Sequence, residues 1–410
     1  MLDRAAFEAF DRADALRPFR DRFALPPGII YMDGNSLGAL PRSVPARIAH
    51  LVAEEWGQDL IRSWNKHGWI ELQHRIGDKI GRLIGAKPGE TVVADSTSVN
   101  LYKLLGAALS LRPERRIILS EAGNFPTDLY IAEGLAALSG RHALRLAEPE
   151  ALEAAIDESV AVLMLTHVDY RTGRMHDLER ITRLAHRAGV VVLWDLSHSA
   201  GAVPVDLNGA EADFAVGCGY KYLNGGPGAP AYLFIAERWQ QQVTVPLTGW
   251  LGHADPFAFE PSYRPAEGIA RAVTGTPPIL SLAALEMGVD IALDAPVDAV
   301  RAKSIRQFEL FAALVEQELP EAGFEIATPR DPAARGSQIC LAHRYAWPIM
   351  QALIGRGVIG DFRAPDIMRF GFTPLYLGFA EIWDAVAIFK DIMTSRSWDR
   401  PEHHASAWVT

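Results

Sequence analysis

The middle of the chain alternates between short apolar runs and amphipathic helical stretches, and this alternation limits the possible folds more than any other feature. Residues 160–165 form an unbroken apolar run of the kind that is buried in parallel sheets. Apolar residues then recur at helical spacing over residues 178–188, and a second apolar run follows at residues 190–194. Residues 160–195 therefore predict a βαβ unit with a right-handed crossover.

Shorter apolar runs extend the same pattern on both sides of this unit. Strands are predicted at residues 91–94, 117–119, 214–216 and 231–235, and a helix is predicted over residues 72–84. Such alternation indicates an open, mainly parallel α/β sheet, in which ligands bind at the carboxyl ends of the strands.

The pattern changes toward the C-terminus. A long amphipathic helix is predicted over residues 299–319, followed by short strands and a last helix at residues 381–393. We therefore expect a large α/β domain over residues 56–290 and a smaller C-terminal α+β domain over residues 291–410. Residues 1–55 are expected to form an N-terminal segment that packs near the small domain.

Charge and apolar pattern exclude several kinds of partner. The chain has 40 Lys and Arg against 50 Asp and Glu, a net charge of −10, so no basic excess exists to neutralise a phosphate backbone. No apolar run approaches the roughly 20 residues that a membrane helix needs. No apolar signal segment opens the chain, and Cys218 and Cys340 are too few for a disulfide framework. We expect a cytoplasmic protein that binds neither nucleic acid nor a membrane.

The adjacent His403 and His404 lack a spaced partner, so no metal site is expected.

Two charged residues follow neighbouring strands of the predicted sheet. Asp195 comes directly after the run at residues 190–194, where a buried acid is costly unless a cation or a strong donor meets it. Lys221 lies in a glycine-rich stretch, residues 217–228, just after the next predicted strand. Taken alone, Asp195 could equally cap a helix, and Lys221 could lie in a surface loop.

Together the two residues form the arrangement that a pyridoxal phosphate (PLP) site requires. A lysine holds the cofactor aldehyde as a Schiff base, and an aspartate keeps the pyridine nitrogen protonated so that the ring withdraws electrons. Ser96, Thr97 and Ser98 follow a predicted strand and offer a phosphate the amides and hydroxyls of a helix N-terminus, although such residues are also common helix caps. Phe125 follows another strand and offers an aromatic face to the ring or a core contact.

Five segments, in the same order along the chain, together resemble the kynureninase family. They are DGNSLG (residues 33–38), FPTD (residues 125–128), DLSHS (residues 195–199), YKYLNGG (residues 220–226), and FTPLY (residues 372–376) with Arg369 ahead of it. The resemblance runs from about residue 30 to residue 376, and the set is far more specific than any one segment. It implies the α/β fold of type I PLP-dependent transferases, with a large mainly parallel sheet domain and a smaller C-terminal α+β domain.

The resemblance also implies a role for each matched residue. Lys221 would form the Schiff base, Asp195 would pair with the pyridine nitrogen, and Tyr220 would contact the phosphate. Because Tyr220 adjoins the lysine, it is also our candidate for the proton donor to the β-carbon. Arg369 would clamp the substrate α-carboxylate. The other cofactor-binding positions that it implies are Thr97, Ser98, Phe125, Pro126, Thr127, Asp128, Thr166, His198, Trp250 and Thr276, the last contributed across a dimer interface. The other substrate-binding positions are Asn35, Ser36 and Trp64.

The activity implied by the resemblance is hydrolysis of L-kynurenine to anthranilate and L-alanine, by a homodimer with its site at the interface. The enzyme alternative is another type I activity, such as a cysteine desulfurase or a class V-like aminotransferase. A desulfurase needs a nucleophilic cysteine on a mobile loop, and neither Cys218 at a strand end nor Cys340 in an apolar stretch is well placed. A non-catalytic PLP-fold binding protein is the third interpretation, which nothing favours because every matched catalytic position is filled.

The resemblance also bears on substrate preference. In the vertebrate branch of the family, the positions that look equivalent to Trp64 and Thr276 carry His and Asn, and the substrate is 3-hydroxykynurenine. Trp64 and Thr276 offer fewer polar groups to the extra hydroxyl. L-Kynurenine is therefore the expected substrate of this chain.

Overall fold

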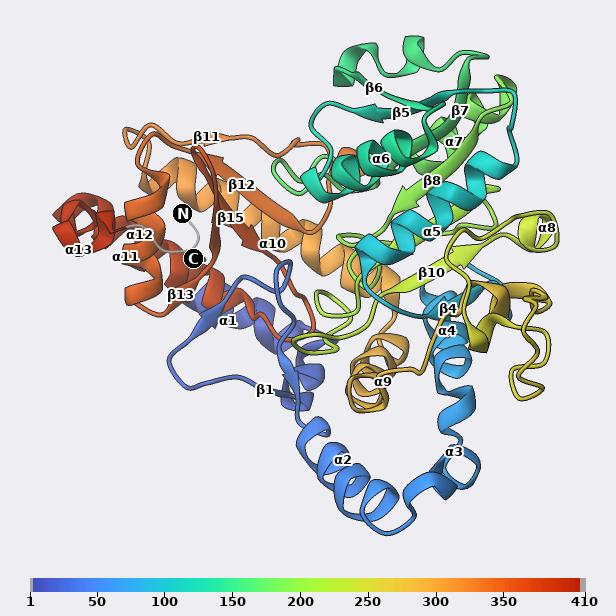
Figure 1. Ribbon diagram of the computed structural model, residues 1–410. Helices are drawn as coiled ribbons and strands as arrows, with labels where there is room; N and C mark the ends of the chain where they lie inside the picture. The colour runs from blue at the N-terminus through green and yellow to red at the C-terminus, as the bar shows by residue number, and fades with distance from the viewer. Residues whose placement is uncertain (1–2, 406–410) are drawn as a thin grey trace.

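A seven-stranded sheet forms the centre of the larger part of the molecule in the computed structural model, which describes residues 3–405 (Figure 1). The strand order is β4-β10-β9-β8-β7-β5-β6, and only β10 runs antiparallel to its neighbours. The strands are β4 (Thr91–Val93), β5 (Ile117–Glu121), β6 (Ala143–Ala147), β7 (Val160–Thr166), β8 (Val191–Asp195), β9 (Phe214–Gly217) and β10 (Tyr232–Ile235). Every residue of β8, β9 and β10 is buried, as expected for a sheet covered on both faces.

The predicted βαβ unit is confirmed. Strands β7 and β8 are parallel neighbours, and α7 (Leu178–Arg187) lies between them in the chain. Sequence reasoning missed β6, because Arg145 interrupts its apolar pattern and Leu146 is 47% exposed. An edge strand of this kind carries no unbroken apolar run to mark it.

Alternating residues of the central strands supply two core layers, one on each face of the sheet. Leu163 and Trp194 face a layer that includes α4 (Leu72–Leu83), α7 and α9 (Ile279–Asp294). Val162 and Leu193 face the opposite layer, which includes α5 (Thr97–Ser110) and α6 (Pro126–Ser139). Because successive strand residues point to opposite faces, an apolar run is required wherever both faces are covered.

The C-terminal part is built on a four-stranded antiparallel sheet. Its order is β11 (Glu325–Ile326), β12 (Gln338–Ala342), β15 (Ile367–Gly371) and β14 (Asp361–Arg363). The helices α10 (Val297–Glu318), α11 (Ala346–Gly355) and α12 (Phe379–Ser395) share a core with this sheet. The helices predicted at residues 299–319 and 381–393 are therefore confirmed, with bounds that differ by no more than two residues.

The N-terminal segment joins this C-terminal part. Strand β2 (Ile30–Tyr31) pairs in parallel with β13 (Val358–Ile359). Helix α1 (Arg4–Ala13) packs on α12, where Asp11 accepts hydrogen bonds from the amides of Phe379 (2.6 Å) and Ala380 (2.9 Å). These two contacts place the start of the chain against the C-terminal sheet and its helices.

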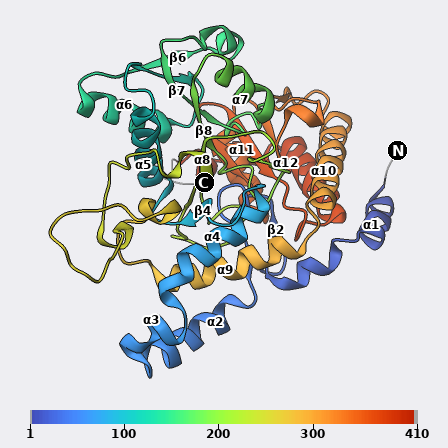
Figure 2. The same ribbon diagram turned by 90° about the vertical axis from the view of Figure 1, so that its right-hand side faces the viewer.

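Residues 44–66 form a helical arm that extends from the body of the molecule. In the chain, this arm lies between the N-terminal segment and the first strand of the seven-stranded sheet. Figures 1 and 2 show α2 (Val44–His50) and α3 (Ser63–Lys66) at the lower edge of the molecule, away from the sheet. Helix α2 contacts α9, and a π-helical turn follows it at Leu51–Trp56. The expected domain boundaries at residues 55 and 290 fall in that turn and inside α9, and they stay predictions. Among residues 3–405, no helix is both long and apolar enough to cross a membrane.

Candidate active site

A cavity of about 290 Å³ opens at the carboxyl ends of the central strands. Its walls come from the N-termini of α5 and α6, from the ends of β7 and β8, and from the loop after β9. The residues that line it are Thr97, Ser98, Phe125, Thr127, Asp128, Thr166, Tyr170, Asp195, Ser197, His198, Tyr220 and Lys221. This is the edge of an open α/β sheet at which ligands bind.

The cavity brings together ten of the thirteen residues predicted around the cofactor. Pro126, Trp250 and Thr276 do not line it. Thr276 is exposed and lines a neighbouring cavity of about 680 Å³, which shares Tyr220 with the first. Trp250 is 41% exposed and packs edge-on against Phe257, with ring centroids 5.6 Å apart. Within one chain, Trp250 and Thr276 thus lie outside the cavity.

The predicted substrate-binding residues lie outside the cavity as well. Trp64 lies on α3 in the helical arm and packs edge-on against Trp69, with ring centroids 5.9 Å apart. Asn35 is fully buried beside Gly371 of β15. Ser36 and Arg369 belong to a polar cluster next to the cavity. The roles of all four stay predictions.

Two buried carboxyl groups lie side by side at the floor of the cavity. Asp195, the last residue of β8, is 3% exposed, and Asp128 in the first turn of α6 is 1% exposed. Burial raises the pKa of Asp195, and burial together with the charge of Asp195 raises the pKa of Asp128 well above its ordinary value. In residues 3–405, neither carboxylate forms an ion pair with a cationic side chain within 4 Å. The pair therefore calls for a cationic or proton-donating ligand group.

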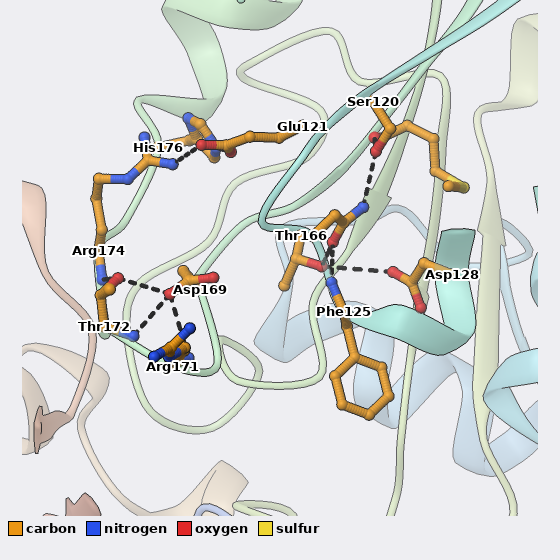
Figure 3. Close-up of polar contacts among 12 residues, drawn as sticks. Ser120, Glu121, Phe125, Asp128, Thr166, Asp169, Arg171, Thr172, Arg174 and His176 are labelled. Carbon is orange, nitrogen blue, oxygen red and sulfur yellow. Dashed lines mark hydrogen bonds and ion pairs between the residues drawn. The ribbon is translucent and has the colours of Figure 1, made fainter. Parts of the chain in front are cut away.

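Local hydrogen bonds fix these two carboxyl groups. The amide of Ser197 donates to Asp195 Oδ1 at 2.8 Å, in the turn that follows β8. Thr166 Oγ1, at the end of β7, lies 3.4 Å from Asp128 Oδ2 (Figure 3). Strands β5, β7 and β8 are parallel and end at the same edge, and α6 follows β5, so Asp128 and Asp195 meet here although they are 67 positions apart in the chain.

His198 and Tyr220 flank the cavity as neutral groups. Burial, followed by the positive charges of Lys221, Arg369 and Arg363, lowers the pKa of His198 well below its ordinary value. Its Nδ1 atom is buried and has no hydrogen-bond partner in the described chain. Burial raises the pKa of Tyr220, so its hydroxyl keeps its proton at neutral pH.

Lys221 enters the cavity from the loop after β9. Its Nζ atom lies 6.0 Å from the centroid of the Phe125 ring and 5.9 Å from that of Tyr220. Phe125 precedes Pro126 at the start of α6, and the amide of Phe125 donates to Asn124 Oδ1 at 2.7 Å. An amine and an aromatic face thus border the same space above the two carboxyl groups.

The N-terminus of α5 forms the other side of the cavity. Helix α5 begins at Thr97, and Ser96 caps it by accepting a hydrogen bond from the amide of Val99 at 3.3 Å. The remaining amides of the first turn have no partner within the helix, and the helix dipole favours negative charge there. Thr97 and Ser98 add two hydroxyl groups to the cavity wall. This combination suits a phosphate group.

Tyr170 is a cavity residue that sequence reasoning missed. It lies in the loop between β7 and α7, and its ring packs edge-on against Phe125 with centroids 5.1 Å apart. The loop is held by Asp169, whose side chain accepts hydrogen bonds from the amides of Arg171 (3.1 Å) and Thr172 (2.7 Å) (Figure 3). A loop residue has no periodic pattern, so only its place soon after a strand end signals it. Ser197 was missed for the same reason.

Arg369 is the centre of a buried polar cluster beside the cavity. It lies opposite Asp361 in the β14–β15 pair and is 1% exposed. Its Nε atom donates to Asp361 Oδ1 at 2.6 Å, and Nη2 contacts Asp361 Oδ2 and Ser36 Oγ. Its Nη1 atom donates to the carbonyl of Tyr170 at 2.6 Å. The guanidinium therefore joins the C-terminal sheet to the loop that carries Tyr170.

Removing Asp361 from this polar cluster should have a large effect on the stability of the fold. Asp361→Ala should lower the free energy of unfolding by about 3–5 kcal/mol, because it leaves the buried guanidinium of Arg369 without its counter-charge. Urea unfolding of the variant and the parent chain measures this. Asp391→Ala is the matched control: Asp391 pairs with Arg356 at the surface and is 60% exposed, so a loss of no more than about 1 kcal/mol is expected. Equal losses in both variants would contradict the assignment.

The histidines and acidic residues near the C-terminus do not gather into a metal-binding set. Between residues 3 and 405, no group of three or more His, Cys, Asp or Glu side chains could hold a metal ion. His404 instead contacts a single acid, with its Nε2 atom 3.3 Å from Asp399 Oδ1.

Comparison with known proteins places the chain. Residues 300–389 match the family model of the kynureninase C-terminal domain, and residues 142–215 match that of the DegT/DnrJ/EryC1/StrS aminotransferase family. A kynureninase from Pseudomonas fluorescens is 51% identical over 408 residues, which cover 98% of both chains.

Solved structures show the same fold at much lower identity. A cysteine desulfurase from Thermococcus onnurineus NA1 matches with a TM-score of 0.77 and 18% identity over 92% of this chain and 98% of that chain. A variant of the lyase C-DES with glycine covalently linked to its PLP cofactor matches with a TM-score of 0.76 and 18% identity, over 91% and 99% of the two chains. The predicted α/β fold of type I PLP enzymes is confirmed. Because the likeness at 51% identity spans nearly the whole of both chains, the chain belongs to the kynureninase family.

Proposed function

We propose that this chain hydrolyses L-kynurenine to anthranilate and L-alanine, with PLP as its cofactor. The observation that carries the proposal is the 51% identity to a kynureninase over 98% of both chains, which spans every segment that lines the cavity. The geometry agrees with it, since an amine, a buried aspartate and an anion site border one cavity.

The residues fit PLP by their own chemistry. Asp195 and Asp128 are buried carboxyl groups with no cationic side chain within 4 Å among residues 3–405, and a protonated ring nitrogen would supply a cationic partner. Thr97 and Ser98, in the first turn of α5, would hold the phosphate. Lys221 would anchor the aldehyde carbon, and Phe125 would cover one face of the ring. When bound, the cofactor supplies an electron-withdrawing ring that stabilises negative charge at the substrate α-carbon.

Each of these side chains then has a task in the reaction. With the cofactor and substrate bound, Lys221 Nζ would be the base that takes the α-proton. Asp195 would hold the negative charge that stabilises a protonated ring nitrogen. Tyr220, whose raised pKa keeps its hydroxyl protonated, is the proton donor to the β-carbon when water has added to the γ-carbonyl and the Cβ–Cγ bond breaks. Arg369 and Phe125 hold the substrate in the reactive geometry.

The burial of both cysteines argues against a desulfurase. Cys218 is 3% exposed and Cys340 is fully buried. Burial raises the pKa of the Cys218 thiol, and it raises the pKa of Cys340 to about 11. Neither side chain is therefore a ready thiolate nucleophile at neutral pH.

An assay of the products separates the candidates. With added PLP, the chain should release fluorescent anthranilate from L-kynurenine, and alanine in equal amount. Sulfide released from cysteine would indicate a desulfurase, and amine transfer to a 2-oxo acid would indicate an aminotransferase. No turnover of any of these substrates by a chain that binds PLP would support a binding protein.

Substrate preference is a second expected outcome. We expect L-kynurenine to be favoured over 3-hydroxykynurenine by about 10- to 100-fold in kcat/KM, because a pocket that cannot pair the extra hydroxyl rejects it only moderately. The double substitution Trp64→His and Thr276→Asn should narrow this gap. Both substrates are measured on the parent chain and on the variant. Equal or better use of 3-hydroxykynurenine by the parent chain would contradict the pocket argument.

A homodimer is part of the proposal. Trp64, Trp250 and Thr276 lie outside the cavity of their own chain, and a second copy of the chain would bring residues at these predicted positions to it. Large apolar side chains are exposed near them, including Ile61 (76% exposed) in the arm and Phe259 (77% exposed) after Trp250. Sedimentation of the parent chain should give twice its mass of 44.9 kDa.

We also propose a cytoplasmic location. Cys218 and Cys340 are both unpaired and buried, which suits a reducing compartment. Fractionation of cells that produce the chain, with detection of the anthranilate-forming activity, tests this.

A further inference from the structure

A second arginine, Arg363, shares the counter-charge of Arg369. It lies on β14, two residues after Asp361, and its Nη2 atom is 2.7 Å from Asp361 Oδ2. One carboxylate therefore serves two guanidinium groups, of which Arg369 is buried and Arg363 has a side chain 35% exposed. The two arginines differ in how many of their donors the protein already uses.

Arg369 has almost no hydrogen-bonding capacity left. A guanidinium carries five N–H donors. Contacts to Asp361, Ser36 and the Tyr170 carbonyl occupy four of those of Arg369, including the whole Nε–Nη2 edge. That edge is the one that would grip a carboxylate with two parallel bonds. Arg369 can therefore offer a substrate carboxylate a single donor while these contacts hold.

Arg363 keeps most of its donors. Its Nη1 atom donates to the Phe362 carbonyl at 2.9 Å, and its Nη2 atom contacts Asp361. Within the described chain, no protein acceptor takes its other three N–H groups. Arg363 is thus the better-equipped partner for an incoming carboxylate.

The cluster carries excess positive charge toward the cavity. Besides Asp361, the nearest acid is Asp33, whose pKa burial and the charge of Asp361 raise to about 7. Near neutral pH, Asp33 is therefore only partly ionised, so the two positively charged guanidinium groups are balanced by fewer than two negative charges. The cluster adjoins the cavity wall, because Arg369 Nη1 donates to the carbonyl of Tyr170, which lines the cavity, and the charge of Arg363 also acts on His198 in that wall. Tyr31 also faces this cluster, and burial raises the pKa of its hydroxyl, so it adds no charge near neutrality.

We propose that Arg363 is a second binding residue for the α-carboxylate of the substrate, acting beside Arg369. Asp361 holds both guanidinium groups, Arg369 gives one donor, and the free N–H groups of Arg363 give the rest. This inference rests on the proposed function, because it takes an α-amino acid as the substrate.

The test compares ligands with and without the α-carboxylate. Arg363→Gln should raise KM for L-kynurenine by about 10- to 100-fold, the effect of losing charge-assisted hydrogen bonds, while kcat changes less than tenfold. The inhibition constant of kynuramine, the amine that kynurenine becomes without its carboxyl group, should change less than twofold. Arg356→Gln is the matched control, because Arg356 is a surface arginine paired with Asp391. It should behave as the parent chain.

Further variants control for failure to fold and for an indirect effect of Arg363 through Arg369. Arg363→Met keeps the aliphatic stem and replaces Arg363→Gln if the latter does not fold, as judged by its thermal unfolding midpoint. If Arg363 acted only by adjusting Arg369 through their shared carboxylate, Arg363→Gln would have no effect in an Asp361→Asn background. Direct contact predicts that the rise in KM persists there.

Three results would overturn the inference. The first is an unchanged KM for L-kynurenine in a folded Arg363 variant, and the second is an equal change in KM and in the inhibition constant of kynuramine. The third is an Arg363→Gln substitution that leaves KM unchanged in the Asp361→Asn background. A parent chain that does not hydrolyse L-kynurenine at all would instead refute the proposed function. The two failures are therefore distinguishable.

Discussion

Lys221→Ala should lose at least about 10³-fold in turnover of L-kynurenine, because one side chain both anchors the cofactor and moves the α-proton. Lys221 Nζ lies within 6.0 Å of the Phe125 ring centroid, on the wall of the cavity that holds Asp195. In residues 3–405 no other lysine lines that cavity, so no neighbour can replace it. The variant should still bind PLP weakly through the anion site at the start of α5.

A labelling experiment makes this assignment independent of activity. Borohydride reduction of the PLP-loaded parent chain, followed by peptide mapping, should place the pyridoxyl group on Lys221. Lys390→Ala is the control, because Lys390 is a surface residue paired with Glu318 and should leave label and turnover unchanged. A pyridoxyl group on any other lysine would show that the site is wrongly assigned.

The central sheet was predictable from the sequence because its strands are buried on both faces. Residues 160–165 and 190–194 contain no charged residue, and the structure places them in or beside β7 and β8 with every side chain buried. Strand β6 was missed because its edge position lets Arg145 and Leu146 reach solvent. A pattern of apolar residues reflects burial of the side chains, so it does not reveal a strand whose side chains are exposed.

The cavity floor was predictable for a related reason. Asp195 and Lys221 each follow a strand, and parallel strands end at one edge of the sheet. The resemblance named Ser36 and Arg369, but their contact with Asp361 was not predictable, because Ser36 and Asp361 meet only through tertiary packing 325 positions apart. Asp361 lies in a strand of three residues, too short to show any period. The helical arm that carries Trp64 extends away from the sheet of its own chain, so a sequence pattern could not place it against the cavity.

The charge of Asp195 should matter for the rate rather than for binding. Asp195→Asn should lower kcat by about 10²- to 10³-fold, the usual effect of removing one preorganised electrostatic contact from a transition state. KM should move little, because the cofactor and substrate keep their other contacts. The substitution is well matched in shape: an asparagine Oδ1 can still accept the amide hydrogen bond of Ser197, now 2.8 Å from Asp195 Oδ1. The variant therefore removes charge and leaves the turn after β8 in place.

A second buried aspartate beside the same sheet provides a control that distinguishes an effect on catalysis from an effect on folding. Asp213 is 1% exposed, directly precedes β9 at the opposite edge of the sheet, and pairs with His186 and Arg238. Asp213→Asn should lower the free energy of unfolding, since its contacts lower the pKa of that carboxyl group, yet it should leave kcat close to that of the parent chain. If Asp195→Asn raised KM and preserved kcat, Asp195 would be only the cap of its turn. A loss of kcat in Asp195→Asn but not in Asp213→Asn is expected, because only Asp195 lies where the ring nitrogen of the cofactor would bind.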